Sequence, residues 1–177
     1  QMCIRDSGYT RSQGTESACK SVAEHLSKYG IDVDHNDVVI SPGCKQALLY
    51  AMMTCLNPED EVILLSPAWP SYEGMLSLIG AVPVNVPVNR HNYHPDMNAI
   101  RSAITPKTKA IMVNSPNNPT GAVYLPSEIK ELTDIAIEND LWIFDDMIYS
   151  DLVYSEHAYV APASLPGGAE RLSLIHI

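Results

Sequence analysis

The sequence predicts an α/β fold of three layers, in which a mainly parallel sheet lies between two layers of helices. Two observations predict it: helical and strand-like patterns alternate from residue 8 to residue 171, and the strand-like runs are apolar on both faces. Strands that are covered on both faces and separated by helices are typical of parallel sheets. We find no repeat, low-complexity tract or linker in this stretch, so we expect one continuous unit.

The first half of the chain alternates helical and strand-like runs. Ala18, Val22 and Leu26 recur at helical spacing, and Tyr29-Gly30 ends that pattern. A second helix follows the turn Ser41-Pro42-Gly43, and a third follows Trp69. We expect helices at 15–28, 44–56 and 72–79, and strands at 38–40, 62–65 and 82–86.

The second half continues the same alternation. Pro126 suits the first position of a helix, because its missing N–H has no partner there in any case. The apolar run Leu141-Trp142-Ile143-Phe144 reads as a buried strand that closes on two aspartates. We expect helices at 96–104 and 127–139, and strands at 109–113 and 141–144.

Composition excludes several classes of function. Apolar residues make up 46% and charged residues 18%, without an apolar run long enough to span a membrane. The net charge of −10 and the absence of a basic stripe argue against a nucleic-acid partner. The cysteines are irregularly spaced and offer no disulfide framework, so we expect a cytoplasmic protein.

Both ends of the chain look foreign to the protein. One strand of a short oligonucleotide encodes LSLIHI at 172–177, and its reverse complement encodes MCIRD and begins a serine codon, at 2–7. This resembles a transposon adapter of sequencing-library preparation, read through on both sides of an insert. We therefore leave residues 1–7 and 172–177 out of fold reasoning and place the genuine protein at 8–171.

The polar clusters of the chain lie where the predicted strands end, which is where ligands bind in parallel sheets. Gly43-Cys44-Lys45 opens a helix, so its backbone N–H groups and the helix dipole suit a phosphate, although an ordinary turn would look the same. Cys44 is either a small packing residue or, beside Lys45 at a helix start, a thiol of lowered pKa. Trp69 is either a core aromatic or a flat wall for a planar ring.

The loop Ser115 to Gly121 and the aspartate pair are the more specific clusters. Asn118 is held between prolines, where its amide could donate to a ligand oxygen, and Asn118-Pro119 and Ser66-Pro67 are candidates for cis bonds. Burying a carboxylate after an apolar strand costs several kcal/mol unless a cation pairs with it. Adjacent strand residues point to opposite faces, so only Asp145 or Asp146 should enter the site, with Tyr149 beside Asp146.

His91 and His94 are the only pair whose spacing suggests a metal. They lie in a polar loop without a third ligand, so we predict no metal site.

Five motifs, in order, resemble the class I aminotransferases of pyridoxal-5′-phosphate (PLP) fold type I. They cover essentially all of 8–171, which would be somewhat under half of a typical family chain. The motifs are GYTRSQG, SPGCKQAL, NPEDEVILLSPAWPSY, ITPKTKAIMVNSPNNPTGAVY and DDMIYSDLVY. The resemblance implies part of a large PLP-binding domain, an amino acid and a 2-oxo acid as substrates, and a homodimer.

The resemblance also implies a role for each candidate residue. Backbone amides of Gly43, Cys44 and Lys45 would bind the cofactor phosphate, and Trp69 would stack on the pyridine ring. Asn118 and Tyr149 would bond the ring's phenolic oxygen, Asp146 would pair with the protonated ring nitrogen, and Tyr9 would reach the phosphate of a neighbouring subunit.

Three residues that the resemblance requires are expected beyond Arg171: the lysine that holds the cofactor covalently, a phosphate-binding arginine and an arginine for the substrate carboxylate. We therefore expect transamination from the full-length parent and no activity from this chain alone. Two alternatives stay open, a fold-type I PLP lyase or synthase of β-elimination type and an aminotransferase-like effector domain of a transcription regulator. The sequence beyond Arg171 and before Gly8 would decide between them.

Overall fold

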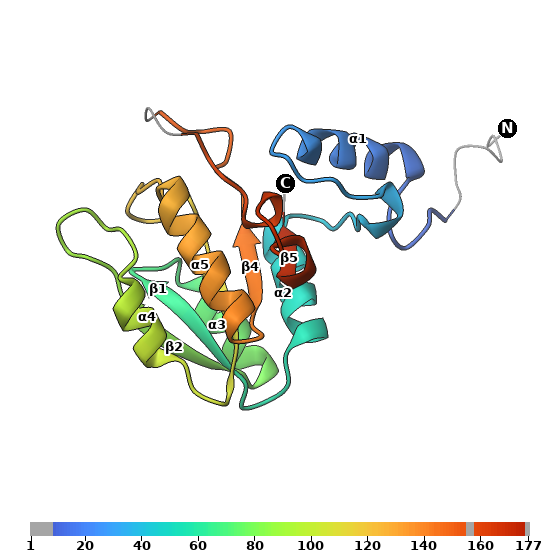
Figure 1. Ribbon diagram of the computed structural model, residues 1–177. Helices are drawn as coiled ribbons and strands as arrows, with labels where there is room; N and C mark the ends of the chain where they lie inside the picture. The colour runs from blue at the N-terminus through green and yellow to red at the C-terminus, as the bar shows by residue number, and fades with distance from the viewer. Residues whose placement is uncertain (1–8, 155–157, 176–177) are drawn as a thin grey trace, which may run out of the picture.

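A computed structural model describes residues 9–154 and 158–175, and for 171–175 it describes the backbone alone. Its centre is a sheet (Figure 1). The strand order is β2-β1-β3-β4-β5, and every neighbouring pair is parallel. The strands are β1 (Glu61–Ser66), β2 (Val82–Pro87), β3 (Thr108–Val113), β4 (Trp142–Asp146) and β5 (Leu172–Ile175). The predicted parallel sheet is confirmed.

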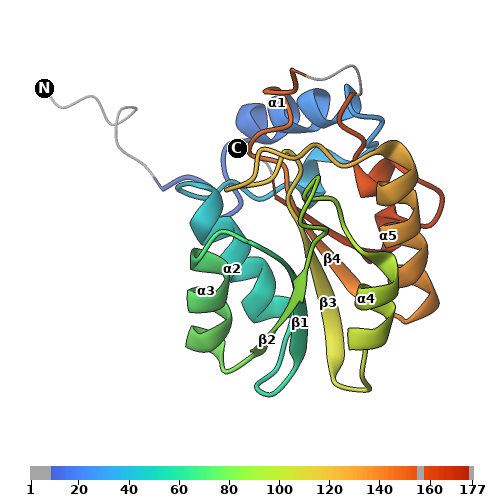
Figure 2. The ribbon, with the colours of Figure 1, turned by 90° about the vertical axis from the view of Figure 1, so that its left-hand side faces the viewer.

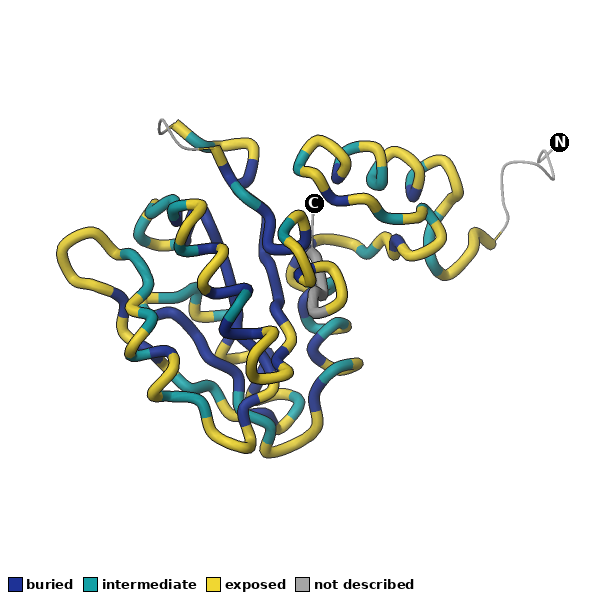
Figure 3. The backbone as a smooth tube through the Cα atoms, in the orientation of Figure 1, coloured by how far each residue is buried: buried dark blue, intermediate teal, exposed yellow. Residues whose placement is uncertain are grey.

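Helices cover both faces of the sheet, as Figure 2 shows. The helices α2 (Cys44–Cys55) and α3 (Ser71–Ile79) pack on one face, against Leu64, Met112 and Phe144. The helices α4 (Met97–Ala103) and α5 (Pro126–Glu138) pack on the other, against Ile63 and Ile111 and their neighbours. Alternate residues of one strand therefore enter different cores, which explains why most of the length of the central strands is dark blue in Figure 3.

A third and smaller core lies beyond the carboxyl end of β4. There α1 (Glu16–Ser27) contributes Leu26, which packs with Met147, Tyr159 and Ala161 from the segment after β4. Three short 3-10 helices complete the elements: η1 (His35–Asp37), η2 (Pro162–Ser164) and η3 (Ala169–Arg171). Residues far apart in sequence thus fix the chain that leaves β4.

Local capping agrees with the expected helix starts. The Thr15 hydroxyl accepts from the N–H of Ala18 at 3.4 Å, and the Asp96 carboxylate accepts from Asn98 and Ala99 at 3.0 and 3.1 Å. Pro126 opens α5, and Glu128 Oε2 accepts from the N–H of Leu125 at 2.7 Å. Each cap satisfies backbone donors that a helix leaves without partners.

Two sequence expectations are wrong. Residues 38–40 form no strand: Val39 is 66% exposed, and the N–H of Ile40 bonds to the carbonyl of Gln13 in a loop instead of to the sheet. The strand β2 is not apolar on both faces, since only Val86 within it is buried. Its place at the sheet edge explains the exposure and tolerates Pro83 and Pro87.

Residues 172–175, which we set aside as foreign, form strand β5 at the edge beside β4. A short apolar segment can add to an open parallel edge whatever its origin, because the ladder bonds are made by backbone groups. The foreign origin of this segment therefore stays a prediction. The predicted adapter segment at 1–7, together with 176–177, lies outside the described residues.

Candidate active site

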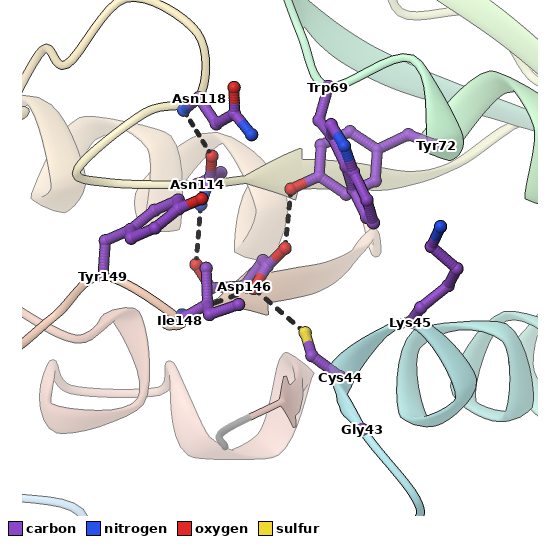
Figure 4. A pocket seen from close by; sticks show the side chains of 10 residues that line it. All are labelled: Gly43, Cys44, Lys45, Trp69, Tyr72, Asn114, Asn118, Asp146, Ile148 and Tyr149. Carbon is purple, nitrogen blue, oxygen red and sulfur yellow. Dashed lines mark hydrogen bonds between the residues drawn. The ribbon is translucent and has the colours of Figure 1, made fainter.

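A pocket of about 250 Å³ opens at the carboxyl ends of the central strands (Figure 4). We call it the strand-end pocket; its lining residues are Gly43, Cys44, Lys45, Trp69, Tyr72, Asn114, Asn118, Asp146, Ile148 and Tyr149. They come from the start of α2, the β1–α3 connection and the first turn of α3, the segment after β3, and the end of β4 with the residues that follow it. The parallel topology is what brings these distant segments together.

The structure places most of the predicted site residues in this pocket. Gly43, Cys44, Lys45, Trp69, Asn118, Asp146 and Tyr149 line it. Tyr9 does not: it is fully exposed, near the start of the described chain. A tyrosine meant to act on a neighbouring subunit is expected to lie outside its own pocket, so its predicted role stays a prediction.

The carboxylate of Asp146 is the central polar group of the pocket. It is 3% exposed and accepts from three donors: the Tyr72 hydroxyl at 2.7 Å, the Cys44 thiol at 3.2 Å and the N–H of Ile148 at 3.3 Å. None of these donors carries a positive charge, and no ion pair in the described part of the chain includes Asp146. A buried carboxylate of this kind calls for a cationic partner.

Burial beside Asp146 holds the protons on its two side-chain donors. It raises the pKa of the Cys44 thiol to about 12, first by desolvation and then by the neighbouring carboxylate. The same causes raise the pKa of Tyr72 well above its usual range. Cys44 is therefore a protonated donor and not the thiol of lowered pKa that its place beside Lys45 allowed.

The start of α2 presents backbone donors to the pocket. Gly43 has φ +95° and ψ 154°, a conformation that is essentially restricted to glycine, and an added Cβ there would meet nothing within 4 Å. Glycine is thus required by the backbone angle and not by crowding. The N–H of Gly43 itself donates to the Ser41 carbonyl at 2.8 Å. The N–H groups of the first turn of α2, which have no acceptor within the helix, and the helix dipole suit an anion such as phosphate.

The loop after β3 is locked by its own hydrogen bonds. Asn117 N–H bonds to the Ala122 carbonyl at 2.9 Å, and the Thr120 hydroxyl bonds to Asn117 Oδ1 at 2.8 Å. Asn118, with its side chain lining the pocket, is held by its backbone N–H, which donates to Asn114 Oδ1 at 2.8 Å. The predicted cis bonds Ser66-Pro67 and Asn118-Pro119 are present, and Ser115-Pro116, which we did not predict, is also cis.

Trp69 forms one wall of the pocket and is only partly buried. Its ring meets Tyr72 edge-on, with centroids 5.4 Å apart, and the Lys45 ammonium lies 4.8 Å from the Trp69 ring centroid. This placement favours the flat wall over the fully buried core aromatic.

Sequence reasoning missed Tyr72, Asn114 and Ile148 as lining residues. Asn114 donates its Nδ2 to the main-chain carbonyl of Asp146 at 2.9 Å, so it joins the ends of β3 and β4. Its position as the first polar residue after an apolar strand is a signal that could have found it. Tyr72 offers only its place three residues after Trp69, at the start of α3.

Asp145 points away from the strand-end pocket. It is 0% exposed, accepts from the Tyr159 hydroxyl at 2.5 Å, and its Oδ1 has no hydrogen-bond partner among the described groups. Burial, with a smaller contribution from Asp146, raises the pKa of Asp145 from 3.8 to about 7, although the Tyr159 hydrogen bond opposes that shift. The two aspartates therefore differ in environment.

The two histidines considered as metal ligands are not among the lining residues of the strand-end pocket. His94 Nδ1 lies 2.7 Å from Glu128 Oε2, close to the start of α5, while His91 is exposed. In the described ranges no cluster of three or more His, Cys, Asp or Glu side chains is arranged for a metal. Nor is any helix there long and apolar enough to cross a bilayer.

Comparison with known proteins identifies the family. The model of the family described as aminotransferase class I and II matches residues 3–176. A probable aspartate/prephenate aminotransferase of Thermus aquaticus is 40% identical over 143 residues, 80% of this chain and 37% of the relative. An aspartate aminotransferase of Musicola paradisiaca is 35% identical over 170 residues, 92% of this chain and 42% of the relative.

A solved structure agrees with these relatives. The aromatic aminotransferase from Pyrococcus horikoshii OT3 superposes with a TM-score of 0.92 at 31% identity, covering 95% of this chain and 46% of that one. The fold and the strand-end pocket thus define a domain of aminotransferase type. The chain belongs to the class I and II aminotransferase family, and it spans 37% and 42% of the lengths of the two curated relatives just described.

Proposed function

We propose that this chain is part of the PLP-binding domain of an enzyme that transfers an amino group between an L-amino acid and a 2-oxo acid. The observation that carries the proposal is Asp146: a carboxylate 3% exposed, surrounded by neutral donors, with no cation against it among the described residues. A protonated pyridine nitrogen would supply the missing positive charge.

The other residues of the strand-end pocket fit the same cofactor. The N–H groups at the start of α2 would bind its phosphate, with the open space in front of Gly43 leaving room for it. Trp69 would lie against the ring, and Asn118 and Tyr149 would hydrogen-bond its phenolic oxygen. When bound, PLP supplies an electron sink for the carbanion that forms as the substrate loses its Cα proton.

In this proposal the chain's own residues bind and orient. Asp146 holds the proton on the ring nitrogen, and the locked loop after β3 fixes Asn118. The two residues approach the pocket from different strand ends and would keep the ring from turning in its plane. Chemistry at the substrate carbon needs the lysine that we expect beyond Arg171.

We also propose a cytoplasmic homodimer. One relative is named an aspartate aminotransferase and one solved structure an aromatic aminotransferase. These names support an amino acid as the substrate but do not indicate which one. The homodimer rests on the resemblance of the motif that contains Tyr9, and the full exposure of Tyr9 is compatible with a contact to a second subunit.

The test uses the full-length parent protein. PLP is titrated into the cofactor-free form and followed by absorbance, and amino-group transfer is measured from a panel of L-amino acids to 2-oxoglutarate. We expect stoichiometric PLP binding and transfer, both strongly reduced in Asp146→Asn. The control is Asp134→Asn, which removes an exposed ion pair with Lys130 on α5. A wild-type protein that binds no PLP would refute the proposal.

A further inference from the structure

Cys44 takes part in the pocket through both its backbone and its side chain. It is the first residue of α2, so its N–H belongs to the helix start that faces the pocket. Its side chain is 6% exposed and turns toward β4, where Sγ lies 3.2 Å from Asp146 Oδ1 (Figure 4). One residue therefore connects the anion-binding helix start with the buried carboxylate.

Both carboxylate oxygens of Asp146 are occupied by donors from outside its own strand. Tyr72 from α3 bonds Oδ2 at 2.7 Å, and Cys44 from α2 bonds Oδ1 at 3.2 Å. The χ2 torsion of an aspartate is broad, so a carboxylate without such partners turns easily. Donors on both oxygens select one orientation.

The thiol can act only as a donor here. Burial and the Asp146 charge raise its pKa to about 12, so the thiolate that nucleophilic or redox chemistry requires is not formed near neutral pH. Cys55, at the other end of α2, makes a natural comparison because burial alone raises its pKa.

We propose that Cys44 is a positioning residue, whose S–H bond to Asp146 works with Tyr72 to aim the carboxylate at the ring nitrogen of the cofactor. This inference rests on the proposed function and extends it to the side chain of a residue for which the resemblance implied only a backbone N–H contact. Since a thiol is a weak donor, its loss should allow the Asp146 carboxylate to rotate without abolishing cofactor binding.

The first test needs no cofactor. In the cofactor-free full-length protein, iodoacetamide labelling of each cysteine is followed by peptide mass spectrometry at pH 7 to 10, in wild type and Asp146→Asn. Removing the charge lets the thiolate form at lower pH, so Cys44 labelling at pH 9 should rise about tenfold or more. Cys55 labelling should not change. Equal Cys44 rates in the two proteins would overturn the coupling between thiol and carboxylate.

The second test measures the protonation of the cofactor's ring nitrogen. The ¹⁵N chemical shift of bound ¹⁵N-labelled PLP is titrated with pH in wild type, Cys44→Ala, Cys44→Ser and the control Cys55→Ala. If Cys44 positions Asp146, the deprotonation midpoint should fall by about one pH unit in Cys44→Ala, because a misdirected carboxylate holds the ring proton less well. Cys44→Ser keeps a hydrogen-bond donor, so its deprotonation midpoint should lie close to that of the wild type.

The outcomes separate the two proposals. A midpoint in Cys44→Ala that equals the wild-type value, or lies above it, would overturn the positioning role while leaving the proposed function intact. If the wild type binds no PLP, the proposed function fails, and the labelling test still decides whether Cys44 and Asp146 interact. Circular dichroism of each variant checks folding, and Cys44→Val, which also removes the donor but fills more of the space, replaces Cys44→Ala if that variant does not fold.

Discussion

Asp145 and Asp146 are neighbours at the end of β4, yet their carboxyl groups lie on opposite faces of the sheet. Asp146 meets Cys44 and Tyr72 on the side of α2 and α3, whereas Asp145 meets the Tyr159 hydroxyl on the other side. The alternation of side chains along a strand separates them. The two aspartates therefore have different environments, and their substitutions should have different effects.

In the full-length enzyme, Asp146→Ala should cost on the order of 3 kcal/mol or more in transition-state stabilisation, over about a hundredfold in kcat/KM. The reason is the loss of the counter-charge of the ring nitrogen. Asp145→Ala should cost far less activity and act mainly on stability. Half-reaction rates with PLP occupancy checked by absorbance separate the variants, and a larger loss for Asp145→Ala would show that the roles are reversed.

Asp145 should make stability fall as pH rises. Its pKa is raised from 3.8 to about 7 in the folded protein, so the folded state holds the proton more tightly than the unfolded chain. Stability is then lost between about pH 4 and pH 7, by on the order of 2–4 kcal/mol, and the full penalty remains at higher pH.

Asp145→Asn is the matching variant, since it cannot ionise. Urea unfolding of the cofactor-free protein at pH 5 and pH 8 should show a smaller difference in unfolding free energy for Asp145→Asn than for wild type. An unchanged difference would mean that Asp145 does not titrate in this range.

Gly43 should resist substitution because of its backbone angle. At φ +95°, Gly43→Ala is strained by about 1–3 kcal/mol and should turn the N–H groups at the start of α2, weakening PLP binding about tenfold. The control is Gly74→Ala within α3, where φ is not positive and the added Cβ meets nothing within 4 Å; it should stabilise by about 0.5–1 kcal/mol. Thermal unfolding measures the stability of the two variants, and PLP titration measures their cofactor affinity. Equal stability and equal affinity in the two variants would contradict the strain argument.

Genomic sequence around this chain should replace residues 1–7 and 172–177 with unrelated codons, because we expect both segments to come from an adapter. The recovered frame should also hold a Ser-x-x-x-Lys type motif and a later arginine. A continuous genomic read through LSLIHI would refute the adapter origin, and a complete downstream frame without the lysine would refute transamination.

Much of the fold could be predicted because it depends on local patterns. Apolar runs placed β1, β3 and β4, and helical spacing and Pro126 placed α1 and α5. The caps at Thr15 and Asp96 in the structure agree with the expected helix starts. The exceptions depend on neighbours in space. Residues 38–40 have strand-like composition, but the N–H of Ile40 bonds to the carbonyl of Gln13 in a loop. The strand β2 is exposed because it lies at the edge of the sheet, where β1 is its one paired neighbour among the described strands.

By itself, the sequence predicted the fold class, the strand ends at which polar residues gather and the placement of Asp145 and Asp146 on opposite faces, because periodicity and alternation are properties of the chain. The preference for Asp146 came from the resemblance to a family. Only the tertiary structure decided what Asp146 touches. Its partners Cys44 and Tyr72 lie 102 and 74 residues away in sequence. Packing of α2 and α3 on one face of the sheet brings Cys44 and Tyr72 within hydrogen-bonding distance of Asp146. Burial beside the Asp146 carboxylate keeps the thiol and the hydroxyl protonated, and no local sequence pattern encodes that burial.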